Sequence, residues 1–492
     1  MQKEHFAIPD EVMGVIETLK KGGHEAYLVG GCVRDLLSKK KPKDWDVTTN
    51  AKPEEIQGLF EETYYNNDFG TVGIILPEPE EEPPHIIEVT PYRLEATYSN
   101  SRHPDSVTFS TNIDDDLKRR DFTINAIAYD PTTEEVIDHF NGQEDLGKKV
   151  VRAVGKAEDR FNEDALRILR AIRFSAQLGF MIAPETEEAI KKTAPNLDKI
   201  SKERIRDEFI KILLSTRPME GLLTCERLGV LKYVLPDLER GIGIEQNQAH
   251  KYDVYEHNLR TLQHAADKEW LLTLRLAALL HDISKPETRA WSDEKKDYTF
   301  HGHEVVGARV AKKILGDLKF PKKTIDDVRT LVRWHMFFSD PDQITLSAVR
   351  RMIRNVGGEA QMRDLLNLRM CDRIGTGRPK EQPFRLRKYT SMVEEALHDP
   401  ISVSMLKIDG GKLMEISGEK PGPKIGYTLH ALLEQVLDDP SKNNAEYLEE
   451  EAKRLISLPE EKLKRIGEAG KQKKDETEAE TVKEIRKKYF VE

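Results

Sequence analysis

The sequence contains few cysteines and no long apolar run. Its three cysteines, Cys32, Cys225 and Cys371, lie far apart and fit neither a zinc spacing nor a disulfide framework, which favours a reducing, cytosolic location. No stretch approaches the roughly 18–20 apolar residues that cross a bilayer. The N-terminal residues carry scattered acids in place of a signal-peptide core, so we expect a first helix there. These absences argue against a secreted disulfide scaffold and against a membrane-spanning protein.

An excess of positive charge is also missing. Lys and Arg number 77 against 87 Asp and Glu, which gives a net charge of −10. This excludes a uniformly basic, nucleic-acid-coating surface. A local basic groove stays compatible with the composition, because RNA binding depends on clustered charge and not on the sum.

The pattern of apolar residues divides the chain into two parts. A length of 492 residues suggests roughly three or four domains. Short strand-like runs mixed with helices predict a small α+β domain at the start, and helical periodicity dominates afterwards. We therefore predict an α+β protein with a sheet-containing domain over residues 1–145, helical segments over 146–250, a histidine-bearing region over 251–375 and a charged helical tail over 376–492.

The stretch "KDWDVTTN" carries two acids one residue apart at the start of a strand-like run. In a strand, Asp44 and Asp46 would project to the same face. Two carboxylates held together repel each other unless a positive charge lies between them. The alternative is an ordinary solvated strand end, which is the commoner meaning of an isolated D-x-D.

A glycine pair precedes this stretch in "VGGCVRD". Gly30 and Gly31 follow a predicted strand and open a predicted helix, where backbone N–H groups can approach a phosphate. Beside them, the two aspartates are a candidate Mg²⁺ site, because Mg²⁺ favours a few carboxylates together with substrate phosphates. Glu88, on a later predicted strand in "IIEVTPYR", is the candidate third acid.

Two further stretches bring arginines and acids together. In "LKRRDFTINAIAYD", Arg119 and Arg120 are candidate phosphate contacts, and Asp121 and Asn125 share a face if a helix begins here. We expect "RFNEDALRILRAIRF" to form one continuous helix. Glu163 and Asp164 would then lie on the same side of that helix as Arg167.

The second stretch suggests base recognition. Asp164 would accept a hydrogen bond from an exocyclic amino group and Arg167 would donate one to a ring nitrogen, a combination that fits cytosine and adenine. Glu163 lies on the same predicted helix face. The alternative is a surface salt bridge between residues four apart, worth about 0.2–0.5 kcal/mol.

In this order and spacing, these motifs resemble the bacterial-type (class II) tRNA nucleotidyltransferase and poly(A) polymerase family. The resemblance spans residues 24 to about 210, and the helical remainder resembles the neck, body and tRNA-holding tail of the CCA-adding members. It implies a polymerase-β-like head that adds nucleotides from CTP and ATP to the tRNA acceptor arm with Mg²⁺. Asp44, Asp46 and Glu88 would be catalytic, the two aspartates as metal ligands; Gly30, Gly31, Arg34, Arg120, Asp121, Asn125, Glu163, Asp164, Arg167, Arg170 and Arg173 would bind the nucleotide.

The segment over residues 94–118, "LEATYSNSRHPDSVTFSTNIDDDLK", has the full length found in family members that add the terminal A. Members restricted to CC addition resemble this chain but are shorter there. The resemblance therefore predicts complete CCA addition, or A addition alone.

A second set of candidate ligands follows in the histidine-bearing region. Adjacent His281 and Asp282 stand in an apolar helix, "LAALLHDISKPE", where an unpaired carboxylate is costly and a metal would remove that cost. The order His, His-Asp, His, His, Asp resembles the two-metal HD phosphohydrolases. It implies hydrolysis of a phosphoester such as a 2′,3′-cyclic phosphate, with Mn, Ni, Co or Fe as the metal and Lys285 near the phosphate. The implied ligands are His257, His281, Asp282, His303 in preference to His301, His335 and Asp372.

We therefore predict a cytosolic CCA-adding enzyme with a second, phosphohydrolase activity. An A-adding enzyme and a poly(A) polymerase of the same family are the nearest alternatives. A phosphohydrolase with a vestigial head and a non-catalytic RNA-binding protein are alternatives of other classes. The sequence leaves the oligomeric state open.

Overall fold

The computed structural model describes residues 5–66, 70–76, 85–94, 108–248, 250–337, 340–398 and 403–491. The chain divides into two compact units, one comprising residues 1–335 and 371–379 and the other residues 336–370 and 380–492. Residues 77–84, the stretch "PEPEEEPP", and most of the full-length segment after Leu94 lie outside the described residues.

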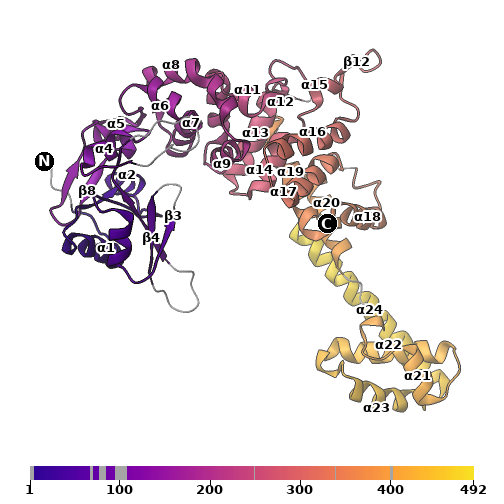
Figure 1. The fold of residues 1–492 in the computed structure, drawn as a ribbon. Coiled ribbons are helices and arrows are strands. Elements are labelled where there is room, and N and C mark those ends of the chain that lie inside the picture. Colours follow the sequence, from indigo (N-terminus) through magenta and orange to yellow (C-terminus); the bar gives the residue numbers. More distant parts are fainter. Residues whose placement is uncertain are drawn as a thin grey trace. The chain divides into compact units, whose positions relative to one another are not determined.

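The first unit begins with a seven-stranded sheet whose strand order is β3-β4-β5-β2-β1-β8-β9. The strands β2 and β5 pair in parallel, and the other neighbours pair antiparallel. Figure 1 shows this sheet at the N-terminal end of the chain. Its strands are β1 (Ala26–Val29), β2 (Asp46–Thr49), β3 (Thr63–Asn66), β4 (Thr71–Leu76), β5 (His85–Pro91), β8 (Ala128–Asp130) and β9 (Glu135–Ile137).

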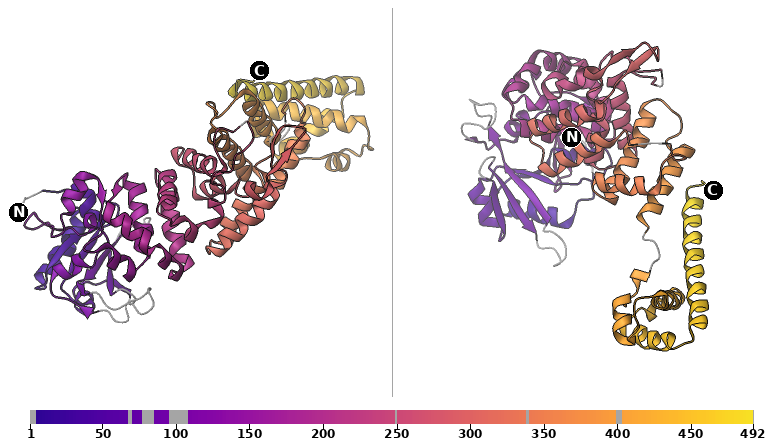
Figure 2. Two further views of the ribbon diagram at one scale, coloured as in Figure 1. Left: turned by 90° about the horizontal axis from the view of Figure 1, so that it is seen from above. Right: turned by 90° about the vertical axis from the view of Figure 1, so that its right-hand side faces the viewer.

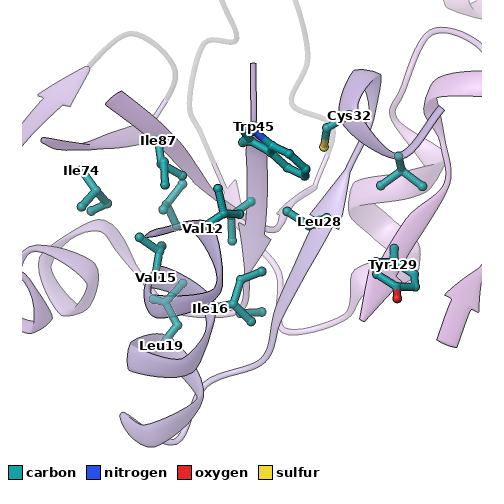
Figure 3. Close-up of a cluster of buried hydrophobic side chains, with 14 of the residues drawn as sticks. Val12, Val15, Ile16, Leu19, Leu28, Cys32, Trp45, Ile74, Ile87 and Tyr129 are labelled. Carbon is teal, nitrogen blue, oxygen red and sulfur yellow. The ribbon is translucent and has the colours of Figure 1, made fainter. Parts of the chain in front are cut away.

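An apolar cluster between helix α1 (Asp10–Lys21) and the sheet forms the core of this region. Val12, Ile16 and Leu19 of α1 pack against residues such as Leu28 and Ile87 of the strands (Figure 3). Trp45 is 7% exposed and belongs to the same cluster, so the tryptophan between the two aspartates anchors that segment to the core. The other helices here are α2 (Gly31–Leu37), α3 (Pro53–Leu59), α4 (Ile113–Lys118) and α5 (Gly142–Lys148), and a short ladder joins β6 (Arg93–Leu94) to β7 (Thr108–Phe109).

Helices make up most of the chain after this sheet, as predicted. Two small ladders were not expected from the helical periodicity, one between β10 (Val150–Val151) and β11 (Met181–Ile182) and the other between β12 (Ala290–Ser292) and β13 (Asp297–Thr299). The first unit continues with α6 (Ala157–Glu163), α7 (Leu166–Leu178), α8 (Pro184–Thr193), α9 (Lys202–Leu213), α10 (Pro218–Arg227), α11 (Leu231–Val234), α12 (Pro236–Glu239), α13 (Val254–Asp267), α14 (Leu272–Leu280), α15 (Lys285–Thr288), α16 (His303–Asp317) and α17 (Lys322–Trp334).

The prediction of one continuous helix through "RFNEDALRILRAIRF" is wrong. Helix α6 ends at Glu163, Asp164 adopts an extended conformation with φ of −145°, and α7 begins at Leu166. The carboxylate of Asp164 accepts a hydrogen bond from the backbone N–H of Leu166 at 3.1 Å. Aspartate competes well for such backbone donors at a helix start, which explains the break.

The second unit contains its own apolar core. Helices α22 and α24 run alongside each other, and Figure 2 shows α24 as one long helix ending near the C-terminus. Gly467 and Gly470 allow the close approach, since a Cβ at Gly470 would lie 2.4 Å from the carbonyl oxygen of His430. The helices are α18 (Leu346–Val356), most of α19 (Glu359–Gly375), α20 (Phe384–Leu397), α21 (Gly410–Ser417), α22 (Pro423–Asp438), α23 (Ala445–Ile456) and α24 (Glu460–Lys488).

Ile86 and Ile87 are neighbours on β5, but Ile86 is 41% exposed and Ile87 is 0% exposed. Replacing each of them in turn therefore tests the position of the core. We predict that Ile87→Ala lowers the free energy of unfolding by about 2–5 kcal/mol, since it leaves a cavity. Ile86→Ala should cost less than about 1 kcal/mol. Urea unfolding followed by circular dichroism measures both, and equal losses would contradict this placement of the core.

Candidate functional site

Three acids gather around the central strands β2 and β5 of the N-terminal sheet. Asp46 opens β2 and pairs in parallel register with Glu88 of β5, so their side chains project side by side. Asp44 lies in the bend before β2 and not in the strand itself, in contrast to the expectation from sequence. Burial raises the pKa of Asp46; Arg120 opposes this shift, while Glu88 and Asp44 add to it. The three carboxylates therefore lie close enough to repel one another.

The positive charge opposite these acids comes from Arg120, which lies just after α4 in the chain and is held by a buried aspartate of that helix. Asp116 is fully buried and forms ion pairs with Arg119 and with Arg120, the latter at 2.9 Å. These contacts orient the Arg120 guanidinium towards Asp46. Nothing in the sequence distinguishes Asp116, because "DDDLK" is equally typical of an ordinary acidic first turn of a helix.

Gly30 brings the backbone close to this group. It has φ of +80° and ψ of −128°, a conformation that other residues adopt rarely. A Cβ at this position would lie 3.1 Å from Nη1 of Arg120 and 3.7 Å from Oδ2 of Asp46. The adjoining cavity has a volume of about 400 Å³. It is lined by polar and charged residues that include Asp46, Tyr64, Thr71, Glu88, Thr90, Arg93, Arg119 and Arg120.

A second network links the sheet region to α7. Arg34 donates to the side-chain oxygen of Asn125 at 2.8 Å, and the amide of Asn125 donates to Asp121 at 3.3 Å. Arg170 of α7 completes the chain with a hydrogen bond to Asp121 at 2.7 Å. Asp121 and Asn125 therefore do meet, although the segment between them is a short 3₁₀ turn (Thr123–Asn125) and not the start of a helix.

The predicted base-recognition residues have separate partners. Arg167 pairs with Glu163 at 2.7 Å and donates to the carbonyl oxygen of Arg119 at 3.1 Å. Asp164 pairs at 2.6 Å with Arg204 of α9. Sequence reasoning missed Arg204, although it lies within residues 24 to about 210, over which the chain resembles the family.

Arg173 lies deeper than the other two arginines of α7 that were assigned to nucleotide binding. It is buried, pairs with Glu208 at 3.1 Å and stacks over the ring of Phe174 at 4.4 Å. Burial is the first cause that lowers the pKa of Arg173, to about 10. Its partners are protein groups, and it packs α7 against α9.

The six histidines and aspartates predicted from the second motif converge in the first unit. Each of these residues is at most 8% exposed, and they form overlapping groups with metal-ligand spacing. His301 is exposed and takes no part in these groups, whereas His303 does. The converging residues are His257, His281, Asp282, His303, His335 and Asp372.

The hydrogen bonds of these histidines show which ring nitrogens face the centre. The Nδ1 atoms of His281, His303 and His335 lie 2.9, 2.6 and 2.7 Å from backbone carbonyl oxygens, to which they can only donate. Their Nε2 atoms then carry lone pairs. The Nε2 atoms of His303 and His335 nevertheless lie 3.1 Å apart, so two lone pairs face each other there. Nε2 of His257 lies 3.0 Å from Nε2 of His281.

Lone pairs that face each other require a positive charge between them, so this donor set fits divalent metal ions. Oδ1 of Asp282 is buried and accepts no hydrogen bond within the described part of the chain, which also fits a metal ligand. Burial disfavours the charged ring of His281, but Asp282 and Asp372 outweigh burial and raise its pKa to about 10. Without metal, a proton therefore supplies part of the required charge.

Two more residues reach this cluster. The Lys285 ammonium lies 2.6 Å from Oδ2 of Asp282. His250, which sequence reasoning missed, groups with His257 and Asp282. Burial, followed by the charge of Lys285, lowers the pKa of His250 to about 3, so its ring is neutral. Its position in the sequence, shortly before His257, does not distinguish it from a histidine that packs in the core.

Comparisons with known families match three parts of the chain. A Poly A polymerase head domain matches residues 26–152, a probable RNA- and SrmB-binding site of polymerase A matches 179–242, and an HD domain matches 254–373.

Among the described residues, no helix is both long and apolar enough to span a membrane.

Relatives of known function align over most of the chain. The CCA-adding enzyme of Streptococcus thermophilus is 34% identical over 89% of this chain and 94% of its own length. The A-adding tRNA nucleotidyltransferase of Deinococcus radiodurans is 33% identical over 83% of this chain and 91% of its own. The crystal structure of the Bacillus stearothermophilus CCA-adding enzyme in complex with CTP aligns with a TM-score of 0.58 and 27% identity, over 90% of this chain and 96% of the other.

The contrast between His303 and His301 tests the metal cluster. We predict that protein dialysed after incubation with Ni²⁺ retains about two ions in this cluster. His303→Ala should lose at least half of this metal, because the variant lacks one imidazole ligand, and His301→Ala should retain all of it. Elemental analysis by mass spectrometry measures the content, and equal retention by both variants would contradict the ligand assignment.

Proposed function

The chain belongs to the family of class II CCA-adding enzymes and poly(A) polymerases with head, RNA-binding and HD domains, and we propose that its head adds CCA to tRNA 3′ ends from CTP and ATP. The position of Asp46 beside Glu88, with Asp44 next to them and Arg120 opposite, carries this proposal. Each addition forms a bond between the tRNA 3′ oxygen and the α-phosphorus, and the bond to the departing pyrophosphate breaks.

Asp44 and Asp46, with Glu88 as the third acid, would hold divalent ions, and Mg²⁺ suits such carboxylates. When bound, these ions lower the pKa of an attacking hydroxyl and neutralise charge on the phosphates. Arg120 is held beside Asp46 by Asp116 and would contact the triphosphate. Because Asp116 already holds this arginine in place, little reorganisation is needed when the nucleotide binds.

The network of Arg34, Asn125, Asp121 and Arg170 would position the nucleotide sugar and phosphates. Asp164 and Arg167 would select the base, since together they present an acceptor and a donor that suit cytosine and adenine. In this proposal, Glu163 orients Arg167 and Arg204 orients Asp164. The helical tail over 376–492 would hold the tRNA, mainly by shape and phosphate contacts. A cytosolic location stays a prediction from the cysteine content.

The HD cluster would perform a second reaction, the hydrolysis of a phosphoester such as a 2′,3′-cyclic phosphate. A water oxygen forms the new bond to phosphorus, a ribose oxygen leaves, and that oxygen takes up a proton. The mixed imidazole and carboxylate set is compatible with Mn, Ni, Co or Fe. Lys285, next to Asp282, would hold a phosphate oxygen.

Addition of A alone is the second candidate function for the head. The similarity to the A-adding tRNA nucleotidyltransferase of Deinococcus radiodurans favours it, because that enzyme aligns with this chain almost as well as the CCA-adding ones. Incubation with tRNAs that end before CCA, after C and after CC, each with CTP or ATP separately, distinguishes the two. Extension of only the CC-ending tRNA would identify an A-adding enzyme, and long A tails on any RNA would identify a polymerase.

Separate sites predict separate losses of activity. Asp46→Asn should reduce tRNA extension by at least about 10²–10³-fold, because it removes one of the carboxylates that hold the ions. The same variant should keep its HD metal content and phosphodiesterase activity. His281→Ala should show the reverse pattern. Gel-based extension assays and phosphate release measure the two activities, and a parallel loss in both variants would refute independent sites.

Gly30→Ala tests the close approach of the backbone to Arg120, and Gly23→Ala is its control. Both glycines have positive φ, but nothing lies within 4 Å of a Cβ at Gly23. Both substitutions should cost about 1–3 kcal/mol of stability. We predict that only Gly30→Ala slows nucleotide addition, by about 10²-fold, because it displaces Arg120. Similar rates for the two variants would show that this contact does not matter for the reaction.

A further inference from the structure

A second cavity adjoins the HD metal cluster and is used by neither proposed reaction centre. Its volume is about 420 Å³, within the range of small-ligand sites. One wall consists of residues 245–248 and 250–253, and the other is the β12–β13 hairpin, which Figure 1 shows next to α15. Both walls belong to the first unit.

Two side chains connect this cavity to the metal cluster. His250 lines the cavity, and one of its ring nitrogens lies within 4.8 Å of the ligand atoms of His257 and Asp282. Gln246 also lines the cavity, and its Oε1 accepts a hydrogen bond from Lys285 at 2.7 Å. Lys285 in turn pairs with Asp282. A ligand in the cavity therefore lies one side chain away from the cluster.

The hairpin wall is aromatic and accessible. Trp291 is 54% exposed and contacts Tyr298 edge-to-face, with ring centroids 5.2 Å apart. Arg289 stacks on Tyr298 at 3.6 Å, which stiffens this wall. An exposed indole that is held beside a cavity is a typical platform for a planar ring.

The opposite wall offers amide side chains, while the aspartates of both walls are already engaged. Asp253 accepts hydrogen bonds from the backbone N–H groups of Gly243 and Glu256. Asp297 accepts one from the N–H of Gln248 at 3.1 Å, which ties the hairpin to this segment. Carboxylates bound in this way are structural. Both ends of the Gln246 amide are engaged as well, because its Nε2 donates to the carbonyl oxygens of Tyr252 and Asp253 while its Oε1 accepts from Lys285. The NH₂ group of Asn247 and the side-chain amide of Gln248 are therefore the groups that can pair with the edge of a base.

We propose that this cavity binds the base of a ribonucleoside phosphate, by stacking on Trp291, while the phosphate lies at the HD cluster. The inference rests on the proposed phosphohydrolase function and narrows its substrate to nucleosides, either free or at an RNA 3′ end. A substrate that consists of a phosphoester without a base would not use the cavity.

The test compares nucleoside and abasic substrates. Wild-type protein should hydrolyse adenosine 2′,3′-cyclic phosphate with a lower KM than ribose 2′,3′-cyclic phosphate. Trp291→Ala should raise KM for the adenosine substrate about 5–150-fold with kcat little changed, and should leave the ribose substrate unaffected. Trp291→Phe should restore most of the affinity. Lys295→Ala is the hairpin control, because Lys295 is exposed and does not line the cavity.

An unchanged KM for the adenosine substrate in Trp291→Ala would overturn the base site while leaving the hydrolase intact. If the wild-type protein hydrolyses neither substrate, the proposed hydrolase fails, and titration with adenosine 3′-monophosphate then decides the base site. Quenching of tryptophan fluorescence that disappears in Trp291→Phe would support the site, and unaltered quenching would refute it. An oligoribonucleotide with a 2′,3′-cyclic phosphate end, compared with the free nucleotide, identifies the source of the base.

Discussion

The parallel pairing of β2 with β5 is the constraint on which the head site depends. It places Asp46 next to Glu88, although the two are far apart in the chain, and the buried Trp45 holds the preceding bend with Asp44 against the same core. Like charges gathered in this way are unfavourable unless positive charge accompanies them. Asp116 meets part of this need by fixing Arg120 opposite the acids, and bound cations would meet the rest.

The HD cluster solves the same electrostatic problem in a buried setting. Backbone carbonyls take the Nδ1 protons of three histidines, so that their Nε2 lone pairs face inward beside two carboxylates. Such a centre is stable only with protons or metal ions in it. The head acids are partly open to solvent, whereas the HD ligands are almost fully buried, so we expect the HD cluster to hold its metals more tightly than the head.

The segment around Asp164 shows how local structure changes the meaning of a motif. A continuous helix would have placed Glu163, Asp164 and Arg167 on one side as a single salt-bridged group. The break after Glu163 instead separates Asp164, which then pairs with Arg204 of α9. Asp164 and Arg167, which we propose select the base, are consequently held by different neighbours. This arrangement keeps each group oriented without pairing the Asp164 carboxylate to the Arg167 guanidinium.

Local sequence patterns were sufficient to predict which residues gather in both clusters. The D-x-D spacing and the glycine turn indicated the head cluster, and the six histidines and aspartates indicated by their order do converge. Only the tertiary structure revealed Asp116, Arg204 and His250 as partners of these centres, and only it built the Trp291 hairpin wall. Asp116 contacts arginines that lie close to it in the chain, whereas Arg204 and His250 contact residues of other elements. Periodicity and spacing encode which face a side chain occupies, but they do not encode which distant backbone or side chain packs against that face.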